Sequence, residues 1–169
     1  MQRFLITATF IAFATFAGAT FAGTGHTLSR NIVIDASADQ VWHLLRQIDG
    51  VERYSGGMVT HSALKGEPGV GCERVCKLNN GMEVTEKVVA FDDQARTYSY
   101  KVTGAPFPVT TMVNSARVVD LGYNRSLLVW TSNYTPGPQG DPQEIAMMLG
   151  GVLEMVTMEV KKLMESNAS

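Results

Sequence analysis

The sequence has few charged residues, and this shortage limits the kinds of partner that the protein can recognise. Charged residues make up 18% of the 169 residues, and the formal net charge is −2. No stretch is strongly basic and no lysine or arginine stripe is present, so the electrostatic footprint of a nucleic-acid-binding protein is missing. We therefore expect no nucleic-acid partner. The length and the 45% hydrophobic content predict one globular domain.

Metal-ligating residues are also scarce. The chain has two cysteines and three histidines, and the spacing of His26, His43 and His61 supplies no ligand set. We expect neither a metal nor a cofactor. Cys72 and Cys76 fall in one predicted strand, about 13 Å apart along it, which is too far for a disulfide between them. The pattern favours two buried thiols, with an intermolecular disulfide or a redox role as the alternative.

Long hydrophobic runs are missing after residue 30, because charged residues interrupt every candidate membrane span. The N-terminus differs, since residues 4–22 are almost wholly apolar or small and follow Arg3. This pattern predicts a signal peptide over residues 1–22, cut after Ala22 or Ala19, with an uncleaved anchor as the alternative. We expect a linker over residues 23–27, a single domain over residues 28–169, and a periplasmic or secreted protein without a stable membrane span.

The remaining sequence alternates between strand-like and helix-like patterns. Ser37 and Gln40 form a capping-box pattern at the start of a short helix. Asp141 begins a second helix, whose apolar residues recur at helical spacing to about Glu165. The predicted elements are strands 28–34, 58–64, 69–78, 82–91, 97–102, 109–119 and 126–134, and helices 38–48 and 141–165. Strands joined by short turns, followed by a long amphipathic helix, favour an α+β fold with an antiparallel sheet.

A predicted hairpin over residues 69–91 is the most informative stretch, because its turn carries Asn80-Gly81. Side chains alternate between the two faces of a strand. Arg74 therefore shares an otherwise mostly apolar face with two cysteines and a leucine, and Glu86 interrupts the apolar face of the next strand. Charges on a buried face are costly unless they are paired, so we expect Arg74 and Glu86 to interact directly or through water. The alternatives are a pair that merely orders the sheet, or a charge that points outward at a strand end.

The order and spacing of these segments resemble the START-like (SRPBCC) superfamily, and most of all its polyketide cyclase/dehydrase group. The resemblance covers about residues 28–165. It is carried by Gly69–Arg74, the Asn80-Gly81 turn, Val84–Glu86 followed by Phe91–Asp93, and Tyr98–Tyr100. A more distant likeness extends to the plant abscisic-acid receptors and the birch-pollen allergen. The tight turn at Asn80-Gly81 replaces the longer gate of the receptors, which argues against hormone-type signalling.

This resemblance implies a helix-grip fold, in which a seven-stranded antiparallel sheet wraps around a long C-terminal helix and encloses a hydrophobic cavity. Carried over residue by residue, it implies that inward-facing side chains of the strands and of the final helix form a ligand-binding site. These residues are Arg74, Cys76, Leu78, Glu86, Tyr100, Val102, Met112, Asn114, Trp130, Ser132, Val152, Met155 and Val156.

Three functions are compatible with such a cavity. The first is an exported protein that binds a small apolar or amphipathic molecule, with a few polar groups fixing its orientation. The second, implied by the family's aromatase/cyclases, is an enzyme of the cyclase/dehydratase type in which Glu86, Arg74 and Tyr100 would act as catalytic residues. The third is an accessory protein with a protein partner, since some exported members of the group assist periplasmic redox enzymes.

Overall fold

The computed structural model describes residues 25–166, so the predicted signal peptide and its cut site lie outside the described residues. The described part contains seven strands, two α-helices and a short 3-10 helix. Their order is β1 (His26–Ile34), α1 (Ala38–Leu45), η1 (Val51–Tyr54), β2 (Val59–Lys65), β3 (Glu73–Leu78), β4 (Glu83–Asp92), β5 (Thr97–Gly104), β6 (Val109–Gly122), β7 (Arg125–Pro136) and α2 (Pro142–Ser166).

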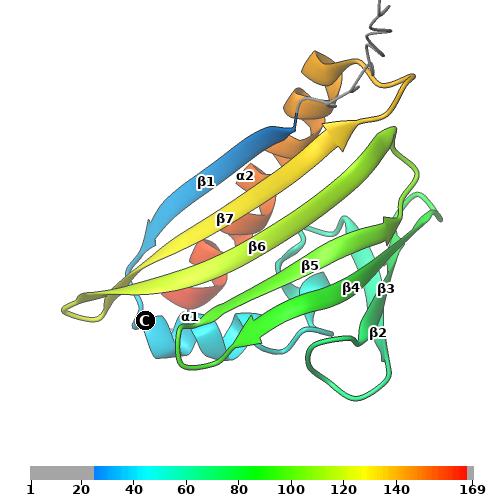
Figure 1. Cartoon of the computed structure of the whole chain (residues 1–169). Helices are drawn as coiled ribbons and strands as arrows, with labels where there is room; N and C mark the ends of the chain where they lie inside the picture. Colours follow the sequence, from blue (N-terminus) through cyan, green and yellow to red (C-terminus); the bar gives the residue numbers. More distant parts are fainter. Residues whose placement is uncertain (1–24, 167–169) are drawn as a thin grey trace, which may run out of the picture.

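The seven strands form one antiparallel sheet in the order β1-β7-β6-β5-β4-β3-β2. The strands from β2 to β7 each pair with the next along the chain, and β1 joins the far edge by pairing with β7. The sheet is strongly curved, and α2 lies along its inner face (Figure 1). This arrangement confirms the predicted helix-grip architecture.

Helix α1 begins where the sequence predicts. The Ser37 side chain accepts a hydrogen bond from the Gln40 backbone N–H, and the Gln40 side chain accepts one from the Ser37 backbone N–H. The helix ends at Leu45, three residues before the predicted end at Ile48. Its buried Trp42 donates to the Asp93 carboxylate over 2.6 Å, which ties α1 to the turn after β4.

The core lies between the sheet and the two helices. Alternating residues of β5, β6 and β7 are buried, as expected for strands with one inward face. Along α2, Ile145, Leu149, Leu153, Val156 and Val160 form the buried stripe. The helical spacing of the apolar residues predicts that Met148 also belongs to this stripe, but its side chain is partly exposed. The sheet and α2 therefore bury apolar side chains between them, and α2 covers the inner face of the sheet.

Three local predictions are wrong. Residues 69–72 are not strand, because Gly69 and Gly71 have φ angles of 137° and 96° and form a turn that precedes β3. Strand alternation predicts that Ala90 shares the inward face of Glu86, but Ala90 is exposed, since a register shift between Val88 and Ala90 reverses the alternation in β4. Strand β1 begins at His26, so it takes in two residues that we expected in the linker.

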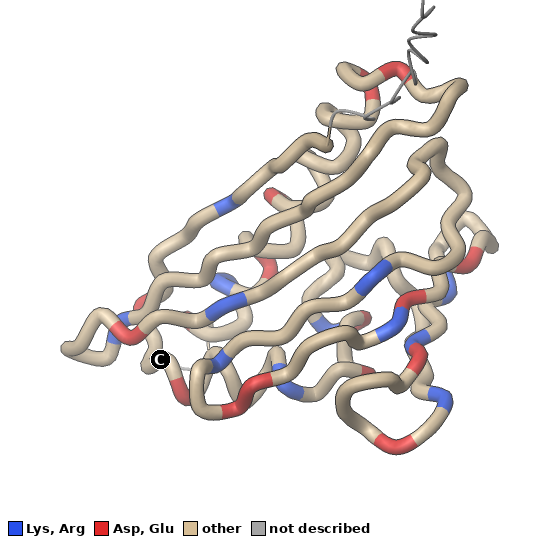
Figure 2. Tube along the Cα trace, viewed as in Figure 1, with Lys and Arg blue, Asp and Glu red and all other residues tan. Residues whose placement is uncertain are grey.

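Charged residues of both signs are interspersed along the trace, and no face of the described chain is uniformly basic (Figure 2). Among residues 25–166, no helix has the length and apolar character needed to cross a membrane.

Candidate functional site

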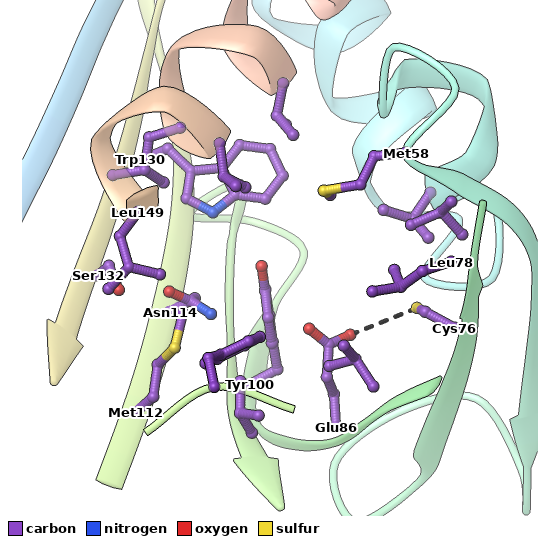
Figure 3. A pocket seen from close by; sticks show the side chains of 18 of the residues that line it. Met58, Cys76, Leu78, Glu86, Tyr100, Met112, Asn114, Trp130, Ser132 and Leu149 are labelled. Carbon is purple, nitrogen blue, oxygen red and sulfur yellow. Dashed lines mark hydrogen bonds between the residues drawn. The ribbon is translucent and has the colours of Figure 1, made fainter. Parts of the chain in front are cut away.

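A cavity of about 130 Å³ lies between the curved sheet and α2. Its walls come from the inner faces of β2 to β7, from one side of α2, from Val51 of η1, and from the loops that hold Met58 and Phe107. Most of these side chains are apolar, and the close view in Figure 3 shows them surrounding an open space. This lining is typical of a site for a small apolar molecule.

The cavity brings together twelve of the thirteen residues that the resemblance implies. These are Arg74, Cys76, Leu78, Glu86, Tyr100, Val102, Met112, Asn114, Trp130, Ser132, Val152 and Val156. Met155 is the exception. It packs against the backbone of Gly56, where an added Cβ atom would lie only 2.9 Å from Met155 Cγ. Gly56 also has a φ of 57°, so both its conformation and the close contact require glycine.

Eight further residues line the cavity and are missing from the predicted set: Val51, Met58, Val59, Val84, Phe107, Met148, Leu149 and Leu153. Parity points to Val84, because it shares a face with Glu86. Helical spacing points to Leu149, which lies one turn from Val152 and Leu153. The loop residues Met58 and Phe107 carry no periodic signal that would assign them to the cavity.

Five polar residues lie in the cavity wall, one on each of the adjacent strands β3 to β7. We call them the polar belt: Arg74, Glu86, Tyr100, Asn114 and Ser132. The strand register sets their alignment, since Arg74 pairs with Glu86, Tyr100 with Asn114, and Asn114 with Ser132. In Figure 3 the side chains of Glu86, Tyr100 and Asn114 point toward the same space. The polar belt therefore gives one side of an otherwise apolar cavity a hydrogen-bonding surface.

Arg74 and Glu86 contact each other directly, which excludes the alternative of a charge that points outward at a strand end. Arg74 Nε and Nη2 lie 2.7 and 2.6 Å from Glu86 Oε2, and Arg74 Nη1 donates to the Ile48 carbonyl oxygen over 2.6 Å. The guanidinium carbon also lies 4.8 Å from the centre of the Tyr100 ring. Arg74 is 2% exposed and Glu86 is 8% exposed, so both charges are out of bulk water.

The electrostatics of this pair favour the charged form of Arg74. Burial on its own would lower the pKa of Arg74, but the adjacent Glu86 carboxylate outweighs that effect and holds the pKa well above its ordinary value. For the neighbouring tyrosines, by contrast, the surroundings favour the neutral form. Burial raises the pKa of Tyr54, Tyr98 and Tyr100 above the ordinary value of 10.0, so these side chains stay neutral at physiological pH.

The two thiols have different surroundings. Burial, reinforced by the Glu86 carboxylate, raises the pKa of Cys76 to about 12, and its Sγ lies 3.7 Å from Glu86 Oε2. Cys76 is therefore a neutral thiol that lines the cavity. Cys72 does not line the cavity, although strand alternation puts it on the same face as Cys76. It packs with Ile48 and Val88 in a separate apolar cluster, and both cysteines are free.

Asn114 and Ser132 differ from the rest of the polar belt, because each holds a fully buried polar atom with no hydrogen-bond partner among the described residues. Asn114 Oδ1 and Ser132 Oγ are buried and unpartnered among the described residues. Leaving a buried acceptor or hydroxyl unpaired costs about 1–3 kcal/mol. The sheet tolerates this cost at two residues that face each other across β6 and β7.

The cavity lining contains no histidine and no activated nucleophile. His26 lies on β1, and His43 and His61 are exposed. Among the described residues, no group of three or more His, Cys, Asp or Glu side chains could hold a metal ion. The chemistry that the lining can supply is therefore burial of an apolar surface, hydrogen bonding from the polar belt, and the paired charge of Arg74 and Glu86.

Solved structures share this fold at low sequence identity. A protein of Bacillus thuringiensis matches with a TM-score of 0.74 and 23% identity, covering 82% of this chain and 98% of its own. The protein XoxI from Bacillus cereus matches with a TM-score of 0.76 and 22% identity, covering 85% and 98%. Norcoclaurine synthase from the plant Thalictrum flavum, solved with a transition-state analogue, matches with a TM-score of 0.68 and 19% identity, covering 86% and 98%.

No curated protein sequence matches the chain at a significant level. The sequence model of one family does match, and it covers residues 25–165, which span all seven strands and nearly all of α2. That family is described as polyketide cyclase/dehydrase and lipid transport proteins. The chain belongs to this polyketide cyclase/dehydrase and lipid transport family.

Proposed function

We propose that the protein binds a small, largely apolar molecule in the cavity between the sheet and α2, and that it acts as a carrier or sensor rather than as an enzyme. The observation that carries this proposal is the lining itself: apolar side chains on all sides and one polar belt. Such a surface favours an apolar ligand through burial and fixes its orientation through a few hydrogen bonds. The family's association with lipid transport is consistent with this role.

The groups in the cavity support binding more than catalysis. Cys76, with a pKa of about 12, is no thiolate nucleophile at neutral pH, and Tyr100 is a neutral phenol. The Glu86 carboxylate is engaged by Arg74, and no histidine is near to exchange a proton with it. A cyclase or dehydratase would need an acid or base free to move a proton.

We also propose that the protein is exported, on the basis of the signal-peptide pattern over residues 1–22. Native mass spectrometry of the protein purified from its own host tests location and ligand together. We expect a mature chain that begins at Gly23 or Thr20, and a bound apolar molecule that organic extraction releases. A full-length chain in the cytoplasmic fraction contradicts export. A co-purifying protein in place of a small molecule supports the accessory role instead.

A cavity-filling variant gives a direct test of binding. Val152 lines the cavity on α2, so Val152→Phe should occupy part of its volume and reduce the affinity for the small uncharged fluorophore naphthylamine by at least about tenfold. Fluorescence titration of the purified protein measures this affinity. Met158→Phe is the matched control, because Met158 is an exposed residue of the same helix. Equal affinity in Val152→Phe and the parent protein would place the binding site outside the cavity.

A further inference from the structure

Asn114 and Ser132 hold an unused pair of hydrogen-bonding atoms in the wall of the cavity. Asn114 is 4% exposed and Ser132 is fully buried, and neither Asn114 Oδ1 nor Ser132 Oγ has a partner among the described residues. The two residues pair across β6 and β7, and both line the cavity. The amide oxygen can only accept a hydrogen bond, whereas the hydroxyl can donate one. Together they match a ligand group that both donates and accepts.

The other half of the polar belt offers no free cation. Arg74 directs three of its nitrogens to Glu86 and to the Ile48 carbonyl oxygen, and its guanidinium lies over the Tyr100 ring. An anionic ligand in the cavity would therefore have to lose its hydration without gaining a positive partner. It would also lie near the carboxylate of Glu86, which lines the same cavity. Both effects disfavour carboxylates and phosphates.

A cationic ligand is disfavoured by a related argument. The charge of Glu86 is already compensated, because Arg74 Nε and Nη2 both contact Glu86 Oε2. A buried ammonium would have to compete with Arg74 for that carboxylate, and its desolvation would be repaid only in part. The second oxygen of Glu86 receives no hydrogen bond from the described residues and is left as an additional acceptor for a neutral donor.

We propose that the cavity selects uncharged hydroxyl compounds, that is, apolar alcohols or phenols. In this arrangement the ligand O–H donates to Asn114 Oδ1, and Ser132 Oγ–H donates to the ligand oxygen. The apolar body of the ligand lies against Trp130, Leu149 and Met112, which line the same part of the cavity (Figure 3). This inference rests on the proposed function, and it deepens that function by naming the polar group that the site reads. Because Arg74 and Glu86 compensate each other, the polar belt offers no free positive charge, and the corresponding carboxylic acids are excluded.

Three probes of matched shape test the selectivity: 4-propylphenol, its methyl ether 4-propylanisole, and 4-propylbenzoate. In the ether the O–H donor is lost and in the benzoate a charge is added, while the apolar body stays the same. Calorimetric titration of the purified protein at neutral pH should give an affinity for the phenol at least about tenfold higher than for the ether, because the ether leaves Asn114 Oδ1 unpaired. The benzoate should bind more weakly still.

Variants assign the two hydrogen bonds to the two residues. Asn114→Leu should reduce the preference for phenol over ether to within about twofold, because the acceptor for the ligand O–H is then gone. Ser132→Ala should weaken the binding of phenol and ether alike, because the oxygen of either ligand can accept from Ser132 Oγ–H. Both variants should also raise the melting temperature of the ligand-free protein, since each one removes an unpaired buried atom. A purely structural role for these side chains would lower it instead. Asn133→Leu is the control, because Asn133 is an exposed neighbour on β7 and should keep the preference.

The outcomes separate this inference from the proposed function. Equal binding of phenol and ether by the parent protein, or a preference that persists in Asn114→Leu, overturns the hydroxyl selectivity and leaves apolar binding intact. Tighter binding of the benzoate overturns it as well. If none of the three probes binds, and the host-purified protein holds no small molecule, then the proposed function fails and this inference fails with it.

Discussion

Replacing Glu86 with leucine should destabilise the protein by about 3–5 kcal/mol, because the variant leaves the Arg74 charge buried without a partner. Arg74 is 2% exposed, and its two contacts with Glu86 Oε2 are the only ion-pair contacts that it makes among the described residues. The Ile48 carbonyl oxygen compensates for only part of the loss. Urea denaturation followed by fluorescence measures the change in the free energy of unfolding.

Two further variants identify the cause of the loss. Arg74→Met combined with Glu86→Leu removes both charges, and it should recover most of the stability, because a buried ion pair is often worth little more than apolar groups of similar volume. Glu154→Leu removes the acidic partner of the exposed pair Arg30–Glu154 and should cost at most about 1 kcal/mol. A Glu86→Leu variant within about 1 kcal/mol of the parent protein would show that Arg74 does not depend on its partner.

The protein should also lose stability steeply above about pH 9, because several buried groups keep their protons only while the chain is folded. The pKa of Cys76 rises from its ordinary value of 9.0 to about 12 on folding, and the pKa values of Tyr54, Tyr98 and Tyr100 rise above 10.0. In this range the unfolded chain releases protons that the folded chain retains. Each such group therefore lowers the free energy of unfolding by about 1.4 kcal/mol per pH unit.

Urea denaturation at a series of alkaline pH values tests this dependence. Tyr54→Phe removes one titrating group, so its stability should fall less steeply above about pH 10. At neutral pH the same variant should be no less stable than the parent protein, because the Tyr54 hydroxyl has no hydrogen-bond partner among the described residues. Tyr123→Phe is the control, since Tyr123 is 97% exposed and lies in water in both states. A parent protein whose stability is constant from neutral pH to about pH 11 would contradict the prediction.

The residues that the sequence places correctly are those governed by strand parity and strand register. In β3 and β4, alternation puts Arg74 and Glu86 on the mostly apolar face of each strand, and the turn that includes Gly81, with a φ of 82°, brings the two into register. The family resemblance assigns Tyr100, Asn114 and Ser132 to inward positions on later strands, and the strand register aligns them there. A period of two residues leaves only two choices for each strand, so one correct assignment fixes all the others on that strand.

The residues that the sequence misplaces are those that no short period controls. An α-helix makes one turn every 3.6 residues, so several neighbouring apolar residues fit the spacing of a buried stripe almost equally well. For this reason the predicted set includes Met155, which does not line the cavity, and omits Leu153, which does. The register shift before Ala90 reverses parity within one strand, and no residue type marks it in advance. Loop residues such as Phe107 reach the cavity through tertiary folding alone.

The pairing of β1 with β7 has a consequence for the order of folding. Every other neighbouring pair in the sheet joins strands that follow each other along the chain, but His26 at the start of β1 pairs with Tyr134 near the end of β7. Closing so long a segment carries an entropic cost that the local hairpins do not pay. During synthesis from the N-terminus, β1 has no strand partner until β7 has been made, and α2 is made after β7. The residues of β7 and α2, which complete the wall of the cavity, are therefore synthesised after the central hairpins.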